Sequence, residues 1–197
     1  MSITDSAEKF SFLTELHLII SDFETLLEYV DPIDENLKTF SHRISSLLLR
    51  VCTAYEAVSK NILLDQKYKI PKGENMDITD YFTLNSQLKL SKYSILFGAW
   101  KSGPKELQPF IDWESTEFQP LDWYQAYNHT KHDRYNNFHE ANLSNLIEAL
   151  AGLFILLYAI YHEDVFNHFQ KNSFYHSDDT SGYIWANDSI FSIKPPA

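Results

Sequence analysis

The first 64 residues carry two apolar stripes with the spacing of an α-helix. Members of each stripe recur every three or four positions, which places them on one helical face. The first stripe consists of Leu13, Leu16, Ile20, Phe23, Leu27 and Val30. The second consists of Leu37, Phe40, Ile44, Leu47, Val51, Ala54 and Val58, and it runs to about Leu64. Pro32 lacks an amide hydrogen and ends the first helix, and Asp34 or Asn36 is placed to cap the second. Two long helices joined by a short turn must lie antiparallel.

A third stripe follows in the second half of the chain. It consists of Leu143, Leu146, Leu150, Leu153, Leu157 and Ile160. One helix over residues 122–169 would be about 70 Å long, which is too long for a chain of this size. We therefore expect a break at YNNF, residues 135–138, because Asn competes for backbone hydrogen bonds. The apolar run 149–161 falls short of the roughly 20 residues that span a bilayer, so it predicts a buried core helix.

Periodicity is lost over residues 66–120, which hold four of the seven prolines and three of the five glycines. Here DITDYF predicts a helical turn and LKLSKYSILF a strand. We expect an irregular insertion with one strand, within a single domain that spans residues 1–197. The tail, residues 172–197, predicts a hairpin that turns at 187–188, or one strand paired with KYSILF. The fold class is thus mainly α: an antiparallel helical bundle with an irregular insertion and a small β element in its C-terminal tail.

Charge and cysteine content restrict the classes of function. The formal net charge is −11, which argues against a protein that coats nucleic acid by charge alone, although a small basic pocket is compatible with it. The single cysteine, Cys52, forms no disulfide within the chain, and we expect it to be a small buried hydrophobe in a reducing compartment. The first twelve residues lack the pattern of a signal peptide, so we expect a cytoplasmic protein with no membrane partner.

Candidate chemistry is concentrated in residues 127–142, YNHTKHDRYNNFHEAN. This segment holds three His, one Lys, one Arg and four Asn. Imidazole transfers protons near neutral pH, and a guanidinium holds a phosphate through a planar fork of donors. Arg134 and His139 suit phosphodiester cleavage without a metal, together with the cation of Lys131 and the amides of Asn128, Asn136 and Asn137. In that reaction an RNA 2′-hydroxyl attacks the neighbouring phosphate.

Arg134 and His139 lie five positions apart, so on one continuous helix they point about 140° away from each other. They can cooperate only if the helix breaks between them or if two chains meet. His132, beside Asp133, is an alternative proton carrier, or it favours the dipole at a helix C-terminus. Asp133 itself is interpreted as an ion-pair partner of Lys or Arg rather than a base. The amide of Asn128 bonds either a substrate or the neighbouring backbone.

Metal binding is the rival chemistry. His129, His132 and Asp133 have i, i+3, i+4 spacing and share one helical face. Three further histidines downstream are additional candidate ligands: His162, His168 and His176. However, neither a Glu-x-x-His pair nor a His-Glu-x-x-His motif occurs in the sequence. The preferred interpretation therefore uses no metal and no cofactor.

The motif Arg134-Tyr-Asn-Asn-Phe-His139 at the start of a long apolar helix resembles the R-x4-6-H motif of the HEPN superfamily. The wider run WYQAYNHTKHDRYNNFHEANLSNLIEALAGLF is similar to bacterial HEPN-like proteins, and DITDYF, LSKYSILF and PFIDW extend the resemblance more weakly toward Asp77. The resemblance implies a helical bundle that forms a homodimer, with both motifs facing one cleft. Many members are metal-independent ribonucleases, often toxins or defence effectors with a nucleotidyltransferase-like or other antitoxin partner. Arg134 would hold the scissile phosphate of RNA and His139 would move protons.

One position departs from the HEPN pattern. In active members the residue after the arginine is commonly Asn, Asp or His, whereas here it is Tyr135. Two hypotheses therefore stand: a metal-independent endoribonuclease, and a catalytically silent HEPN-like interaction module.

Overall fold

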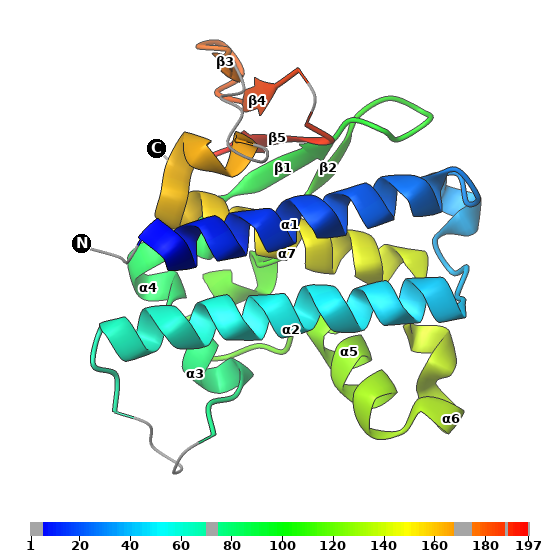
Figure 1. Ribbon diagram of the computed structural model, residues 1–197, viewed down its shortest axis with the longest axis horizontal. Coiled ribbons are helices and arrows are strands. Elements are labelled where there is room, and N and C mark those ends of the chain that lie inside the picture. Colours follow the sequence, from blue (N-terminus) through cyan, green and yellow to red (C-terminus); the bar gives the residue numbers. More distant parts are fainter. Residues whose placement is uncertain (1–5, 70–74, 168–174, 188, 197) are drawn as a thin grey trace.

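Two long antiparallel helices form one side of the protein in the computed structural model, which describes residues 6–69, 75–167, 175–187 and 189–196. Figure 1 shows α1 (Ser6–Leu27) and α2 (His42–Asp65) side by side, running in opposite directions as predicted. A third long helix, α7 (Leu143–Tyr161), packs against both. The fold is mainly helical, with a small antiparallel sheet beyond α1.

The boundary between α1 and α2 differs from the prediction. Residues Asp34–Asn36 form a separate 3-10 turn, and α2 begins only at His42. Its N-cap is Ser41, whose hydroxyl accepts a hydrogen bond from the amide of Ile44 at 3.1 Å. The predicted caps, Asp34 and Asn36, are therefore wrong. The reason is that the chain between the two helices pairs with the start of α7. The carbonyl oxygen of Thr39 accepts a hydrogen bond from the amide of Leu143, the first residue of α7.

The central helix α7 is buried on nearly all sides, which confirms the predicted core helix. Fourteen of its nineteen residues are buried, including two of its three alanines and its glycine. Over Leu143–Phe166 the chain is long and apolar enough to cross a membrane by length and composition alone, but 72% of the apolar 18-residue stretch within it is buried inside the protein. Its hydrophobicity is explained by contacts with α1, α2 and α5 (Asp122–His132).

The segment expected as an irregular insertion is more ordered than predicted. It contains α3 (Ile78–Phe82), α4 (Asn85–Leu88), β1 (Ser94–Phe97) and β2 (Lys105–Leu107), joined by short 3-10 turns. The helical turn at DITDYF is confirmed, but the strand at LKLSKYSILF covers only its last four residues, and a second strand follows. The physical reason is burial: Phe97, Phe110 and Trp113 lie in the same core cluster as the long helices.

The C-terminal tail completes a five-stranded antiparallel sheet in the order β2-β1-β5-β4-β3. Its strands are β3 (Tyr175–Ser177), β4 (Ile184–Ala186) and β5 (Phe191–Lys194). Both predicted alternatives occur together, because β5 pairs with β1 from Ser94↔Lys194 to Phe97↔Phe191 and also pairs with β4. The predicted turn at 187–188 includes a residue outside the described part of the chain.

The break before α7 exists and includes the predicted place, but it is more extensive than the sequence predicts. Helix α5 ends at His132, and Asp133 leaves the helical region with φ −141° and ψ 73°. The short helix α6 (Arg134–Asn137) then passes into the 3-10 turn η4 (Phe138–Glu140) before Asn142 caps α7. The YNNF segment therefore holds the end of α6 and the start of η4, and two further interruptions flank it. Figure 1 shows α6 at a corner of the molecule, at the far end of α5.

Candidate active site at the corner of α5, α6 and α2

Arg134, the first residue of α6, binds a histidine from a distant part of the chain. Its Nη2 lies 2.8 Å from Nδ1 of His42, the first residue of α2. A guanidinium can only donate hydrogen bonds, so Nδ1 of His42 accepts and the imidazole carries its proton on Nε2. Both side chains are exposed. The contact uses one of five N–H donors, which leaves the remaining donors of Arg134 for an anionic group.

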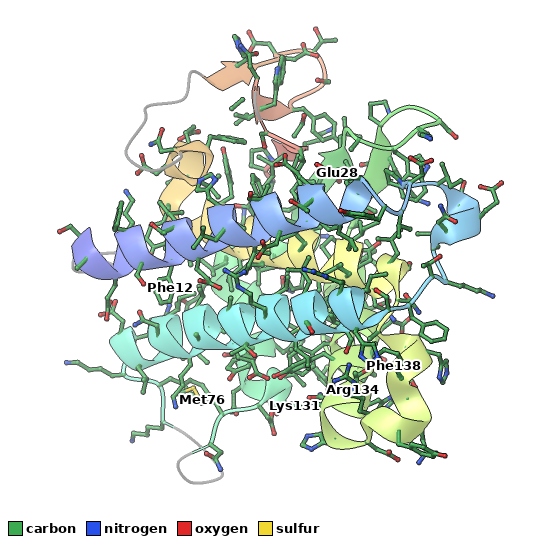
Figure 2. All side chains as sticks on the ribbon, turned by 45° about the vertical axis from the view of Figure 1, so that its right-hand side comes forward. Phe12, Glu28, Met76, Lys131, Arg134 and Phe138 are labelled. Carbon is green, nitrogen blue, oxygen red and sulfur yellow. The ribbon has the colours of Figure 1, made fainter. Side chains whose placement is uncertain are left out.

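Two phenylalanine rings support this pair. The guanidinium carbon of Arg134 lies 5.0 Å from the ring centroid of Phe138, within the range of a cation–π contact. The His42 ring lies 5.0 Å from the same centroid, and Phe40 meets Phe138 edge-to-face at 5.5 Å. Phe40 is 47% exposed, so an apolar surface adjoins the cation. In Figure 2, Arg134 and Phe138 lie together beneath the N-terminal end of α2.

The chain before α2 brings these groups together. Phe40 and Asn142 form an antiparallel β-bridge, and the carbonyl oxygens of Leu37 and Thr39 accept from the first two amides of α7. These hydrogen bonds satisfy backbone donors that a helix N-terminus otherwise leaves unpaired. They also fix Phe40 and the start of α2 beside η4, which carries Phe138.

His139 lies in η4, five residues after Arg134, and its side chain is exposed. Within the described part of the chain, its imidazole makes no hydrogen bond or ion pair. The chain leaves the helix at Asp133, before Arg134, and it changes from α6 to η4 at Asn137, between Arg134 and His139. Among the described residues the Arg134 side chain contacts His42 and Phe138, and it makes no hydrogen bond with His139. The structure thus brings Arg134 to His42 and not to His139.

Asp133 has a structural role at the corner, and its predicted ion pair with Lys or Arg is not found among the described residues. Its carboxylate caps α6, accepting from the backbone amide of Asn136 at 3.3 Å and from the Asn136 side chain at 2.7 Å. Asn137 donates to the carbonyl oxygen of Asp133 at 3.1 Å. Short polar side chains favour such local bonds over a continuous helix, which explains the break after His132. The side chain of Asn136, a predicted phosphate-binding residue, therefore has a structural role at this corner.

Lys131 points toward α2 and is held by a tyrosine. Its Nζ donates to the hydroxyl of Tyr127 at 2.9 Å, and this bond, with the nearby charge of Glu56, raises the pKa of Lys131. Burial raises the pKa of the Tyr127 phenol. Beside it the phenol of Tyr124 donates to Glu56 at 2.7 Å, and burial followed by this hydrogen bond raises its pKa as well. At neutral pH this part of the site therefore holds neutral phenols beside a charged ammonium group.

The remaining predicted residues do not form a metal site. His129 binds Glu140 through Nδ1 at 2.8 Å, which ties α5 to η4. His132 ends α5 with an exposed side chain, and Asn128 is half-buried. Neither makes a side-chain hydrogen bond among the described residues. Among the described residues no group of three metal-ligating side chains occurs, and within the predicted set His129 binds Glu140 while Asp133 binds Asn136. His168, an additional candidate ligand, lies outside the described residues.

His42 is the site residue that sequence reasoning missed. It precedes Arg134 by 92 positions and lies between Phe40 and Ile44 of the second apolar stripe without belonging to it, and a single histidine there carries no motif. The only feature that distinguishes His42 is its place at the start of a helix, and a cap at Asp34 or Asn36 predicts a different start. In comparisons with models of protein families, with curated proteins and with solved structures, nothing matched this chain.

Proposed function

We propose that this protein is a HEPN-type endoribonuclease that needs no metal, with Arg134 and His139 as its catalytic residues. The observation that carries the proposal is the exposed guanidinium of Arg134, held at the corner over Phe138 with donors left for a phosphate. In the proposed reaction, the 2′-hydroxyl of RNA attacks the adjacent phosphorus and the bond to the 5′-oxygen breaks. Arg134 stabilises the charge on the phosphoryl oxygens, and His139 transfers protons.

The proposal includes a homodimer. Arg134 is turned to His42 and makes no hydrogen bond with His139 of the same chain among the described residues, so we expect a phosphate to contact one residue from each of two copies. The HEPN resemblance, in which both motifs face one cleft, favours the same arrangement. It also suggests a role as a toxin or defence effector in the cytoplasm, with an antitoxin or a nucleotidyltransferase-like protein as partner. Because the net charge is −11, which disfavours a large RNA-binding surface, we expect RNA to bind only at this small group of cationic side chains.

The test is cleavage of purified total RNA in buffer with EDTA. The wild type should degrade RNA, and Arg134→Ala and His139→Ala should each lower the rate by at least about 100-fold, since each removes a charge-stabilising or proton-transferring group. Lys60→Ala and His176→Ala are matched controls, because they remove a cation and an imidazole from exposed positions on α2 and β3. Absence of cleavage by the wild type, or equal rates in wild type and both site variants, contradicts the proposal.

Mixing the two inactive variants tests the shared site. If each site takes Arg134 from one chain and His139 from the other, a mixed dimer of Arg134→Ala and His139→Ala contains one intact site. After subunit exchange, about a quarter of wild-type activity should return. If the wild type is active and dimeric but the exchanged mixture stays inactive, each site draws both residues from a single chain.

A silent interaction module is the second candidate, and one side chain favours it. Tyr135, which replaces the polar residue common in active HEPN proteins, is 96% exposed beside Arg134. A large apolar ring left in water next to a cation is typical of surfaces that bind other proteins. Tyr135→Asn restores the common residue type. If the wild type is inactive and Tyr135→Asn cleaves RNA, the module is the better description.

A further inference from the structure

The acceptor for Arg134 comes from α2, an element to which the proposed mechanism assigns no role. His42 accepts from Arg134 Nη2 at 2.8 Å, and both groups lie against Phe138. We propose that His42 is a positioning residue, which holds the Arg134 guanidinium in one orientation so that its remaining donors meet the phosphate of the substrate. The inference rests on the proposed function, because it assigns Arg134 to phosphate binding.

The direction of the hydrogen bond separates this role from proton transfer. Because arginine only donates, His42 must present an unprotonated Nδ1, and its proton occupies Nε2. In that form neither ring nitrogen has a lone pair free to take a proton from a hydroxyl. A positively charged His42 would lose the bond and repel the guanidinium. His42 therefore acts through Arg134 while the contact lasts, and proton transfer remains with His139.

The two partners have unequal support from the fold. Arg134 starts a four-residue helix on the surface, and a long side chain in such a place has many rotamers. His42 starts a helix of 24 residues, directly after the N-cap Ser41 and next to the segment bridged to Asn142. An acceptor on this rigid support reduces the freedom that Arg134 loses when a phosphate binds.

The experiment compares His42→Ala with His42→Asn, whose Oδ1 lies near the position of Nδ1 and accepts from Arg134. Two quantities are measured: kcat/KM for RNA cleavage, and the affinity for an uncleavable 2′-O-methyl RNA oligonucleotide. His42→Ala should lower both about tenfold, because a hydrogen bond to a charged group is lost. His42→Asn should stay within about threefold of the wild type. In an Arg134→Ala background, His42→Ala should have no further effect, since their shared interaction is already absent.

Ser46→Ala, at an exposed position in the second turn of α2, is the matched control, and thermal unfolding verifies that each variant folds. Equal values for His42→Ala and the wild type overturn the inference. So do equal losses in His42→Ala and His42→Asn, or losses that add in the Arg134→Ala background. If Arg134→Ala abolishes cleavage while His42→Ala does not weaken it, only the inference fails. If the wild type binds the oligonucleotide without cleaving RNA, and the affinities follow the expected pattern, only the enzymatic proposal fails.

Discussion

Glu148 is a half-buried carboxyl group that makes no ion pair among the described residues. It lies on α7, and burial raises its pKa to about 7, an effect that the charge of Lys105 partly opposes. Lys105 itself donates to Asp34 at 2.8 Å and lies 4.0 Å from the ring centroid of Trp100. A carboxyl group held in this way favours its protonated form in the folded protein.

This carboxyl group makes stability depend on pH. In the unfolded chain Glu148 loses its proton near pH 4.5, whereas in the folded protein it keeps the proton up to about pH 7. The unfolded state therefore binds fewer protons between these values, and the free energy of unfolding falls as pH rises through that window. Glu148→Gln should add about 2 kcal/mol at pH 8 and almost nothing at pH 4. Urea unfolding at both pH values measures the difference.

Glu117→Gln, an exchange of the same kind at an exposed position, is the control and should show no such difference between the two pH values. A gain from Glu148→Gln that is equal at both pH values would contradict the argument. It would mean that the carboxyl group is as hydrated in the folded protein as in the unfolded chain.

Single residues were predictable where chemistry depends on residue type, and not where it depends on distant neighbours. Cys52 was expected to be a buried hydrophobe in a helix, and it is buried in α2. The guanidinium of Arg134 makes it a candidate by residue type alone. Its partner His42 lies 92 positions away, and no sequence pattern links the two residues. Nearby cations predict an ion pair for Asp133. In the structure its carboxylate instead accepts a hydrogen bond from the amide of Asn136, three residues along the chain.

The helices were predictable from periodicity, and their ends were less so. The three apolar stripes lie within or close to α1, α2 and α7, since burial of one face is what a 3.6-residue period records. The end points depend on single caps. Ser41 was overlooked because Asp34 and Asn36 are equally good caps by type. The choice among them is made by the β-bridge between Phe40 and Asn142, a contact between distant parts of the chain.

Asn142 links two of these elements and gives a prediction about the corner. Its side-chain oxygen accepts from the amide of Asn145 at 3.1 Å and so caps α7, while its Nδ2 donates to the carbonyl oxygen of His139. Asn142→Ala should lower the free energy of unfolding by about 1–2 kcal/mol, whereas Asn142→Asp keeps the acceptor and should cost less than about 1 kcal/mol. Chemical denaturation measures both. Equal losses would show that the cap at α7 contributes nothing.

Across the whole molecule, the part least visible in the sequence is the sheet. Its central pair joins β1 from the predicted insertion to β5 at the end of the chain, which are nearly 100 residues apart. Short apolar runs at both places suggest strands, but neither run specifies its partner or register. The arrangement follows from burial, because Phe191 and Ile193 of the tail are inaccessible to solvent and Phe191 packs against Phe154 of α7.

Phe191 provides the corresponding prediction. Its ring centroid lies 5.4 Å from that of Phe154 on α7 and 5.6 Å from that of Phe97 on β1, so the tail is part of the core. Phe191→Ala should lower the free energy of unfolding by about 3–5 kcal/mol. Ser192→Ala, one position along on the other face of β5, should change it by less than about 0.5 kcal/mol. Comparable small losses in both variants would mean that the sheet is an appendage to the helices.

We propose that the corner of α5, α6 and α2 cleaves RNA by attack of the 2′-hydroxyl, without a metal. Analysis of the product ends in EDTA tests it most directly, with an RNA oligonucleotide and the same oligonucleotide carrying 2′-deoxy sugars. We expect 2′,3′-cyclic phosphate and 5′-hydroxyl ends from the RNA oligonucleotide only, and none of these products with Arg134→Ala. Products with 5′-phosphate ends, cleavage of the deoxy oligonucleotide, or unchanged cleavage by Arg134→Ala would contradict it.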